Sequence, residues 1–251
     1  GHEGSDEHHD KEWVSEKVKK SIDRVGADRF VAVCSDNTGN TKAARRLLTN
    51  EVDTIQDLQD CCHHIHNTIK NISDLSEFKP MLSMVKAIIK HFSKSTYSTT
   101  MLQRERRVGE NGEDEPVHAL QRIGKTRFGT YWIAAHALDQ CLPNIRALTR
   151  SNVISFRSKK VQDLFTNRTS TTYQIFELGL IQYIHTVAPF IRSLWALESS
   201  EANASDVYVF WLATGATLTN LFSKPEDVSG IPRRLAENII EIYNRRFKEF
   251  F

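Results

Sequence analysis

Apolar residues recur at helical spacing in the first part of the chain, and the pattern then changes. Between residues 11 and 25 they fall on one face of a helix, which Gly26 ends. The run Phe30–Cys34 is almost wholly apolar, which predicts a strand buried on both faces, as in a parallel sheet. A turn, a helix over about 41–50 and a weaker strand within 53–61 follow. This order of elements predicts α/β topology for the first part of the chain.

The pattern of the remaining chain is helical. Positions 81, 85, 88 and 92 form the apolar stripe of an amphipathic helix, with lysines at 86 and 90 away from it. The segment 172–197 is apolar nearly all round, so we expect that helix to be central. Further helices are predicted over 128–148, 205–222 and 232–251.

These patterns predict a mainly α protein with a small α/β portion. We expect a disordered N-terminus over residues 1–9 and an α/β portion over residues 10–73, with about two parallel strands. Residues 74–251 should form a helical body. The Gly-rich, charged segment 106–118 within it predicts an exposed loop.

Composition and charge narrow the function only slightly. The 251 residues are 40% apolar and 25% charged, as in an ordinary globular protein. The net charge is +2, so binding to nucleic acid would need a local basic patch. No apolar run is long enough to predict a membrane span or a signal peptide. The four cysteines form no disulfide-type framework, which favours a reducing, intracellular location.

Asp36 is the first candidate for chemistry, because it comes just after a predicted buried strand. Open α/β sheets place functional groups at that end of a strand, and a carboxylate there can hold Mg²⁺. The alternative is structural, namely an Asp that forms a turn or caps the helix starting near Thr41. A single carboxylate is too few for two-metal phosphoryl chemistry.

The stretch DCCHHIHN, residues 60–67, raises the question of a metal site. Two cysteines and three histidines resemble zinc ligands in type, but no second CxxC or HxxxH pair occurs in the chain. The cluster alone is expected to supply two ligands at most, so we predict no metal. The structural alternative is a packed cysteine with hydrogen-bonded histidines.

Arg127 lies in the third candidate segment, GKTRFGTYW, residues 124–132. GKT here is not a phosphate-binding loop, since the upstream glycine and strand that such a loop requires are missing. Arg127 could still grip a phosphate at a helix start, or form a salt bridge. Basic clusters near residues 45, 104–107, 157–160, 233 and 245 are typical of solvated helix faces, unless they converge in space.

Three of these segments, in their order, resemble the hAT family of DNA transposases and its domesticated relatives. SDNTGNTKA carries Asp36, Asn37 and Asn40, and is similar to that family's TDNAxNxxxA segment. CCHHIHN matches its C-x-x-H-x-x-N pattern through Cys61, His64 and Asn67. TRFGTYW, with Arg127, resembles the segment that opens a helical region, and LWALESSEANASDVYVFW is similar to a late segment.

The resemblance implies a ribonuclease H-like domain with a large helical insertion, here as a partial core followed by the insertion body. The family moves DNA phosphodiesters with an Asp-Asp-Glu trio that binds two Mg²⁺ ions. Asp36 matches the second acid, His64 with Cys61 matches a supporting position, and Arg127 matches the start of the insertion. The chain begins after the strand of the first acid, and no SERxFS-like segment carries the third. Asp36 is therefore expected to be a vestigial ligand position.

Three functions follow from this comparison. The first is a truncated or domesticated transposase-derived domain that lacks catalysis and binds nucleic acid or a protein partner, with a nuclear location. The second is a repurposed enzyme or small-molecule-binding protein with a pocket in the helical body. The third is a fragment of an active nuclease, in which Mg²⁺ would be needed only if other segments complete the site; otherwise no cofactor and no membrane are expected. The possible pocket residues are Tyr173, Glu177, Tyr183, His185 and Trp195.

Overall fold

The computed structural model describes residues 10–108, 113–116, 119–124, 127–167 and 169–251. The chain divides into two compact units, one up to His64 and one from Ile65 to Glu249. The division falls inside α3 (Cys61–Ser73). The sequence predicted a boundary after residue 73, at the end of this helix. The predicted disorder of residues 1–9 lies outside the described residues.

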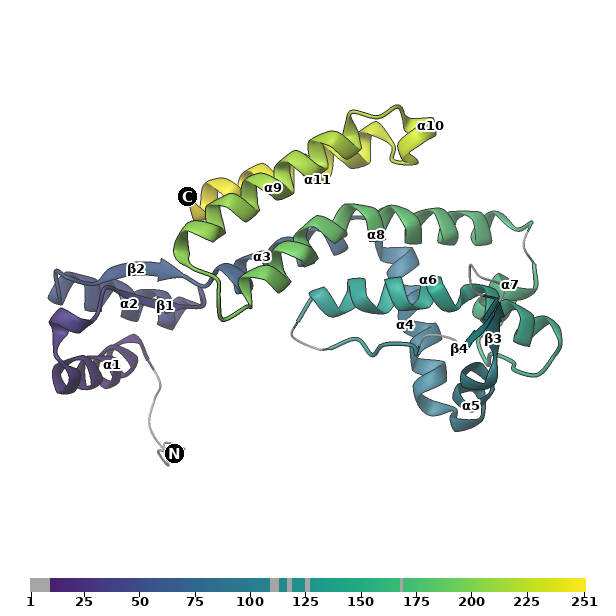
Figure 1. The fold of residues 1–251 in the computed structure, drawn as a ribbon, viewed down its shortest axis with the longest axis horizontal. Coiled ribbons are helices and arrows are strands. Elements are labelled where there is room, and N and C mark those ends of the chain that lie inside the picture. The colour runs from purple at the N-terminus through teal and green to yellow at the C-terminus, as the bar shows by residue number, and fades with distance from the viewer. Residues whose placement is uncertain (1–9, 109–112, 117–118, 125–126, 168) are drawn as a thin grey trace. The chain divides into compact units, whose positions relative to one another are not determined.

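The first unit is the α/β portion and carries the two parallel strands (Figure 1). In register, Ala32 of β1 lies opposite Gln56 of β2, and Ser35 lies opposite Gln59. Because the strands are parallel, the helix between them is a crossover. The elements in chain order are α1 (Lys11–Val25), the 3₁₀ helix η1 (Ala27–Arg29), β1 (Ala32–Ser35), α2 (Gly39–Glu51) and β2 (Gln56–Gln59).

A small apolar core holds the first unit together. The side chains of Ile22, Leu48 and Ile55 are buried, and Val33 of β1 packs against them. The N-terminus of α1 is capped by Asp10, whose carboxylate accepts a hydrogen bond from the Trp13 amide at 2.9 Å. Gly26 ends α1 at a φ of 106°, which favours glycine. The first unit is therefore built around α1, α2 and one face of the sheet.

The prediction that the first strand is buried on both faces is wrong. Val31 is 78% exposed and Cys34 is also exposed, whereas Phe30 and Val33 pack on the core. The reason is that only one described strand, β2, pairs with β1, and the helices cover one face. An apolar run alone does not reveal how many neighbours a strand has.

The second unit is helical, apart from one short hairpin (Figure 1). Its residues begin within α3. The further elements are α4 (Lys79–Lys94), α5 (Thr96–Arg104), β3 (Arg106–Val108), β4 (Asp114–Pro116), α6 (Gly129–Arg150), α7 (Lys159–Thr166), α8 (Thr171–Leu197), α9 (Ala204–Phe222), α10 (Glu226–Ser229) and α11 (Arg233–Phe250).

The helix α8 packs against α4, α6, α7 and α9, so its predicted central place agrees with the structure. Although the helix is apolar nearly all round, one of its sides is open. Ile175 and Ile181 are exposed, and Trp195 is 52% exposed. The opposite side carries the buried stripe that includes Phe176, Leu180 and Val187 in the core.

The predicted exposed loop 106–118 contains regular structure. Its two ends form the antiparallel strands β3 and β4, with Arg106 opposite Pro116 and Val108 opposite Asp114. The residues at 109–112 and 117–118 lie outside the described residues. The charge and glycine content of the segment predicted a loop and gave no sign of the two short strands.

The observed architecture is mainly α with a small two-stranded parallel sheet, which confirms the predicted fold class. Among the described helices, none combines the length and apolar character that crossing a membrane requires. The sequence also predicts that the α/β portion is part of a ribonuclease H-like core. That core has a larger sheet than these two strands, so its presence stays a prediction.

Candidate functional site

Asp36 lies directly after β1, at the edge of the sheet where both parallel strands end. Its Oδ1 accepts hydrogen bonds from the hydroxyls of Thr41 (2.6 Å) and Thr38 (3.2 Å). The Thr41 hydroxyl is the main cause that lowers the pKa of Asp36; partial burial opposes it, and Thr38 reinforces it. The side chain therefore fastens the turn that leads into α2, as the structural alternative from the sequence expects.

The residues around Asp36 do not fit a two-metal centre. Such a centre needs several carboxylates converging on the ions. Within the described ranges, Asp36 belongs to no group of three potential metal ligands. Two threonine hydroxyls already share its Oδ1. No Mg²⁺ step is therefore assigned to these residues.

Replacing Asp36 by Asn should lower the stability of the first unit by an amount that depends on pH, because the carboxylate is charged only above its pKa. The folded-state pKa is below the ordinary 3.8, so the ionised group stabilises the fold above that pH, and this contribution is lost as the pH falls through the lowered value. We expect Asp36→Asn to be less stable than the wild type near pH 7, by about 0.5 kcal/mol at this largely solvated site. The difference should vanish near pH 2. Hydrogen exchange of the α2 amides at both pH values measures it, because this exchange reports the opening of the first unit, and an unchanged difference contradicts the assignment.

Arg45 is the side chain that ties this edge of the sheet together, although it is only 2% exposed. Its Nη1 donates to the carbonyl oxygens of Ser35 (3.0 Å) and Asp36 (2.6 Å) and to the Ser35 hydroxyl. Its Nη2 donates to Asn37 Oδ1 at 2.9 Å, and its Nε pairs with the Asp57 carboxylate on β2. One guanidinium thus joins the ends of both strands.

The prediction that Arg45 belongs to a solvated basic cluster is wrong, and only its neighbour Arg46 is exposed. A buried Arg is stable here because its donors meet several oxygens. Asn37, exposed itself, also donates to Gln59 at 2.6 Å, and Asn40 lies exposed in the first turn of α2. The two asparagines of the resemblance therefore lie on the same turn as Asp36.

The second motif begins α3, directly after β2. Cys61 and Asn67 are half-buried, and His64 is buried with 6% of its surface exposed. Asn67 falls in the second unit, whereas Cys61 and His64 belong to the first. A neighbour of this motif, His63, lies close enough to Asp36 to add a small electrostatic contribution to its lowered pKa, after the larger one from Thr41.

Asp60 is a residue of this edge whose importance the sequence reading missed. It follows β2 as Asp36 follows β1, and its amide donates to the Ser35 carbonyl at 2.9 Å. Its Oδ1 accepts the His63 amide at 3.0 Å, which caps the start of α3. The donor atoms of Asp60, Cys61 and Cys62 all lie within 4.8 Å of one another. The sequence could have indicated Asp60, because an aspartate directly follows each of the two strands, Asp36 after β1 and Asp60 after β2.

Cys61 is expected to be the most reactive thiol of the first unit. A hydrogen bond from the Cys62 thiol is the main cause that lowers the pKa of Cys61 to about 7, whereas burial is the main cause that raises the pKa of Cys34. At neutral pH we expect iodoacetamide to modify Cys61 at least about tenfold faster than Cys34, although Cys34 is more exposed. Mass spectrometry of timed samples measures both rates. Cys62→Ala should slow Cys61, and faster labelling of Cys34 contradicts the prediction.

Arg127 lies immediately before α6, with its side chain exposed. Its carbonyl oxygen accepts hydrogen bonds from the amide (3.0 Å) and the hydroxyl (2.7 Å) of Thr130. These bonds fasten the start of α6 and leave the guanidinium facing solvent. Its neighbour Lys125 lies outside the described residues.

Two of the five predicted pocket residues lie in one polar cluster. Tyr173 donates to Glu177 Oε1 at 2.8 Å, and Arg146 of α6 pairs with the same oxygen at 3.0 Å. The Arg146 guanidinium also lies over the Tyr173 ring, 4.5 Å from its centre. Glu177 therefore has the partner that a partly buried carboxylate needs.

The structure does not bring the other three predicted pocket residues to that cluster. Tyr183 is buried and its hydroxyl shares a hydrogen bond of 2.8 Å with Ser73, while burial raises its pKa. His185 is exposed, and Trp195 meets Trp132 edge to face on an open side of α8. The prediction of one pocket of buried polar residues fails for His185 and Trp195, because they lie on the open side of the helix.

A different part of the second unit gathers positive charge. From Lys79 to Arg104 the chain has five Lys and Arg residues and no Asp or Glu. Lys86, Lys90 and Lys94 are spaced by four residues on α4, and all three are exposed. In the described part of the chain, no ion pair joins these three lysines to a carboxylate.

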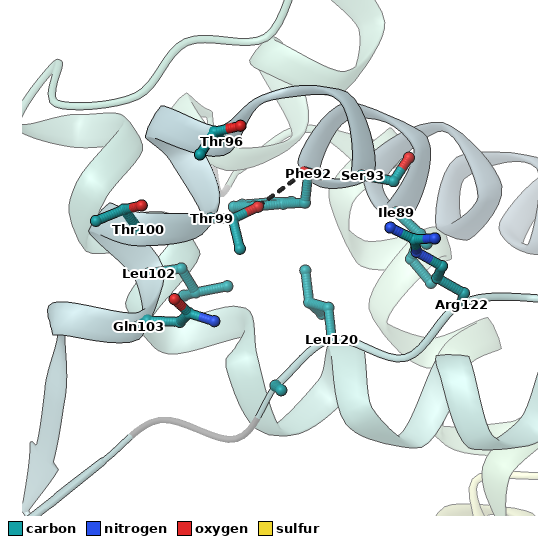
Figure 2. Close-up of a pocket in the computed structure, with 11 residues that line it drawn as sticks. Ile89, Phe92, Ser93, Thr96, Thr99, Thr100, Leu102, Gln103, Leu120 and Arg122 are labelled. Atoms are coloured by element: carbon teal, nitrogen blue, oxygen red, sulfur yellow. Dashed lines mark hydrogen bonds between the residues drawn. The ribbon is translucent and has the colours of Figure 1, made fainter.

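Two hollows are lined by Lys90, and a third beside them is lined by Arg122; a fourth, of about 160 Å³, is lined by Lys86 together with Asp74. The largest, of about 900 Å³, lies between α4, the start of α5 and the segment before α7. A second, of about 320 Å³, is lined by Lys86, Lys90 and Arg122. Figure 2 shows the third, of about 370 Å³, with Arg122 at one end and Gln103 at the other. The charged and aromatic side chains that line the largest hollow are Lys90, Lys94, Arg157, His91, Tyr97 and Phe156.

We call Lys86, Lys90, Lys94, Arg122 and Arg157 the basic face. Among the described residues that line the first three hollows, none is an Asp or a Glu. Hydroxyl groups of serines and threonines stand between the cations, and Tyr97 is 59% exposed. Phosphate oxygens accept hydrogen bonds from such donors, and exposed aromatic rings stack on bases.

Comparison with known proteins identifies the N-terminal third of the chain. Residues 2–88 match the family model of a domain of unknown function (DUF659), which is found in hAT-like transposase-related proteins. The matched segment contains Asp36, Cys61, His64 and Asn67, on which the sequence resemblance rests. No curated protein and no solved structure matches the chain.

Proposed function

We propose that this chain is a transposase-derived domain that acts by binding nucleic acid and does not itself cut it. The premise is that residues 2–88 match a domain found in transposase-related proteins. Transposases act on DNA, so a domain that retains their fold can still bind DNA after it has lost catalytic activity. A nuclear location, expected from the sequence, goes with this proposal.

The basic face is the observation that supports the binding role most strongly. The whole chain has a net charge of only +2, so the cations on this face are concentrated locally. Neutralising phosphates with such cations releases counterions, which supplies most of the affinity of binding that does not depend on sequence. The hollow of about 900 Å³ beside Lys90, Lys94 and Tyr97 could take a phosphate and one unstacked base.

The turn at Asp36 supports the absence of cutting. Its carboxylate is engaged by Thr38 and Thr41, and Asp57, another acid of the same sheet, is paired with Arg45. A carboxylate that fastens its own turn has a structural reason to be kept without any metal.

A titration of fluorescently labelled DNA tests the proposal. Single-stranded and double-stranded oligonucleotides are titrated with the protein at about 50 mM and about 200 mM salt. We expect binding at the lower salt that weakens steeply at the higher one, with single strands bound at least as well because Tyr97 can stack on a free base. Absence of binding at the lower salt overturns the proposal.

A second candidate function is a nuclease whose active site is completed by other segments or another chain. Two observations favour it. Asp36 and Asp60 follow neighbouring parallel strands and so lie at one edge of the sheet, and the exposed Val31, directly before β1, leaves apolar surface uncovered. More strands and more carboxylates would have to be supplied for two-metal chemistry.

A nicking assay with Mg²⁺ on supercoiled DNA separates the two candidates. The nuclease reading predicts nicking by the wild type that Asp36→Ala abolishes. The binding reading predicts equal background in both proteins, with DNA binding retained in Asp36→Ala. Asp36→Asn serves as the folded control, since it keeps an acceptor for Thr41.

A further inference from the structure

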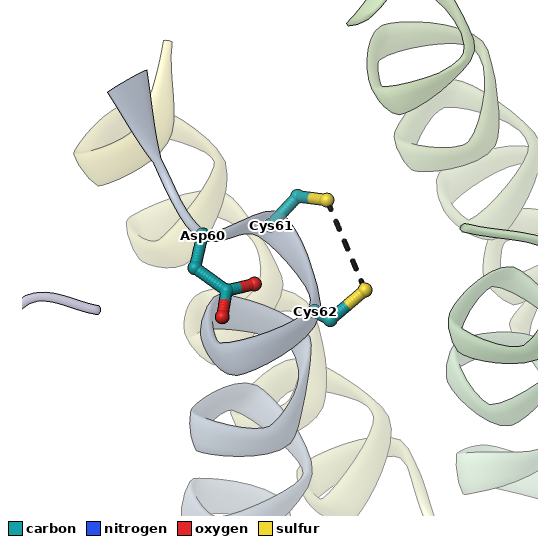
Figure 3. A group of neighbouring side chains, drawn as sticks. All are labelled: Asp60, Cys61 and Cys62. Atoms are coloured by element: carbon teal, nitrogen blue, oxygen red, sulfur yellow. Dashed lines mark hydrogen bonds between the residues drawn. The ribbon is translucent and has the colours of Figure 1, made fainter. Parts of the chain in front are cut away.

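Three potential metal ligands of consecutive residues meet where β2 ends and α3 begins. Figure 3 shows the carboxylate of Asp60 beside the side chains of Cys61 and Cys62. Their donor atoms all lie within 4.8 Å of one another. We propose that these three residues bind one soft divalent cation of the zinc type.

The distance between the two sulfur atoms carries the first step of the argument. The Sγ atoms of Cys61 and Cys62 are 4.0 Å apart. Two thiolates bound to a tetrahedral Zn²⁺, each at about 2.3 Å, lie about 3.8 Å from each other. The thiols therefore need to move by only a few tenths of an ångström to share an ion.

The third ligand comes from Asp60, whose carboxylate can serve two purposes. Its Oδ1 accepts the His63 amide at 3.0 Å. A carboxylate has four lone-pair positions on two oxygens, so it can keep this bond and also bind a cation. The Asp60 amide is in turn bonded to the Ser35 carbonyl at 2.9 Å. The ligand set is thus held by the sheet and by the first turn of a helix.

The donor set selects the class of ion. Thiolate ligands favour Zn²⁺ and its softer analogue Cd²⁺ over Mg²⁺ and Ca²⁺, which prefer oxygen alone. Each thiol that binds loses its proton to solvent, and water completes the tetrahedron in sites with three protein ligands. All three residues are half-buried, so the ion can enter from solvent.

This site goes beyond the expectation from the sequence, which allowed the cysteine and histidine cluster two ligands at most. The spacing of cysteines and histidines cannot predict this site, because its third ligand is an aspartate. Asp60 comes directly after β2 and directly before the two cysteines. The proposal is independent of nucleic-acid binding, since all three ligands lie in the first unit and the basic face lies in the second.

Titration of the reduced full chain with Cd²⁺ tests the site, because the ultraviolet charge-transfer band of Cd²⁺ reports thiolate ligands only. That choice matters, as His2, His8 and His9 could bind metal without giving this band. We expect saturation at one thiolate-bound Cd²⁺ per chain. Cys61→Ser and Cys62→Ser should each weaken binding by at least about tenfold, and Asp60→Asn, which keeps the acceptor for His63, should weaken it by about tenfold.

Cys34→Ser is the matched control, because it removes a thiol of the same unit that lies outside the group of three. It should leave the Cd²⁺ affinity unchanged. The proposal is overturned if no charge-transfer band forms, if Cys34→Ser removes the band, or if either Cys61→Ser or Cys62→Ser leaves the affinity unchanged.

A measurement on the wild type avoids any effect of substitution on folding. Alkylation is followed by mass spectrometry with and without Zn²⁺. Bound Zn²⁺ should slow the modification of Cys61 and Cys62 together by at least about tenfold, and leave that of Cys34 unchanged. Protection of neither cysteine, or of only one, overturns the proposal.

Discussion

Replacing Arg45 by Ala should unfold the sheet edge and α2 locally while the helical unit stays folded. The substitution removes a guanidinium that is 2% exposed and leaves the Asp57 carboxylate without its cation. The Ser35 and Asp36 carbonyls each lose one donor and keep the Asp60 amide and the Thr41 hydroxyl, respectively. Losing a buried hydrogen-bonded cation costs about 3–5 kcal/mol. We expect about 3 kcal/mol here, because the Asp57 side chain is 32% exposed and water can reach it.

Peptide-resolved hydrogen exchange measures this effect where it occurs. Because the chain has two units, one overall unfolding free energy is not well defined, whereas exchange of the β1 and α2 amides reports their own opening. Arg46→Ala is the matched control, since it removes an exposed Arg one position away and should change exchange by less than about 0.5 kcal/mol. Equal exchange in the two variants would show that the hydrogen bonds of Arg45 do not stabilise this edge of the sheet.

Replacing Lys86, Lys90 and Lys94 together by Gln should nearly abolish nucleic-acid binding. Each lysine that contacts a phosphate contributes on the order of 1 kcal/mol, so losing three weakens binding by about 100-fold. The three side chains are exposed on one face of α4, and Gln is a good helix former, so the fold should survive. Fluorescence anisotropy with labelled DNA at low salt measures the affinity.

The control for this variant must remove the same charge elsewhere. Arg233, Arg245 and Lys248 are exposed on α11, and ion pairs join Arg233 to Glu237 and Arg245 to Glu249. Their triple replacement by Gln lowers the net charge equally, but two of the three cations it removes already have acidic partners. It should weaken binding by less than about threefold. Equal losses in both triple variants would mean that overall charge, and not the basic face, drives binding.

Much of the fold could be predicted because it depends on local pattern. The helix predicted over residues 11–25 is α1, with its stop at Gly26, and the two parallel strands follow from one apolar run, a helix and a weaker strand pattern. Such features are set by periodicity and turn residues within a short window. The exposure of Val31, just before β1, and of Cys34 within it could not be predicted, since it depends on which other strands are present.

The candidate site was harder to predict, because its parts are fixed by packing. Arg45 looks like any cation on a helix until the sheet edge is placed beside it. His185 and Trp195 lie on an apolar helix, but the neighbouring helices leave their side open. The turn role of Asp36, one of its two alternatives from the sequence, is easier to foresee, because its hydrogen-bond partners Thr38 and Thr41 are close in sequence.

One feature of the sequence points to the basic face without any structure. The absence of Asp and Glu from Lys79 to Arg104 is visible without any structure, and it singles out α4 and α5 from the other basic clusters. The convergence of Arg157 with Lys90 and Lys94 at one hollow, by contrast, needs the tertiary arrangement. Runs that lack acids are therefore a better guide to a basic face than pairs of cations.

The salt dependence of DNA binding tests the central claim most directly. The logarithm of the affinity is plotted against the logarithm of the salt concentration for the wild type, the α4 triple variant and the α11 triple variant. If the basic face contacts phosphates, the slope for the α4 variant should be smaller than that of the wild type by about 3, with the α11 variant close to the wild type. Equal slopes for all three proteins, or no binding by the wild type at the lowest salt, would contradict the account.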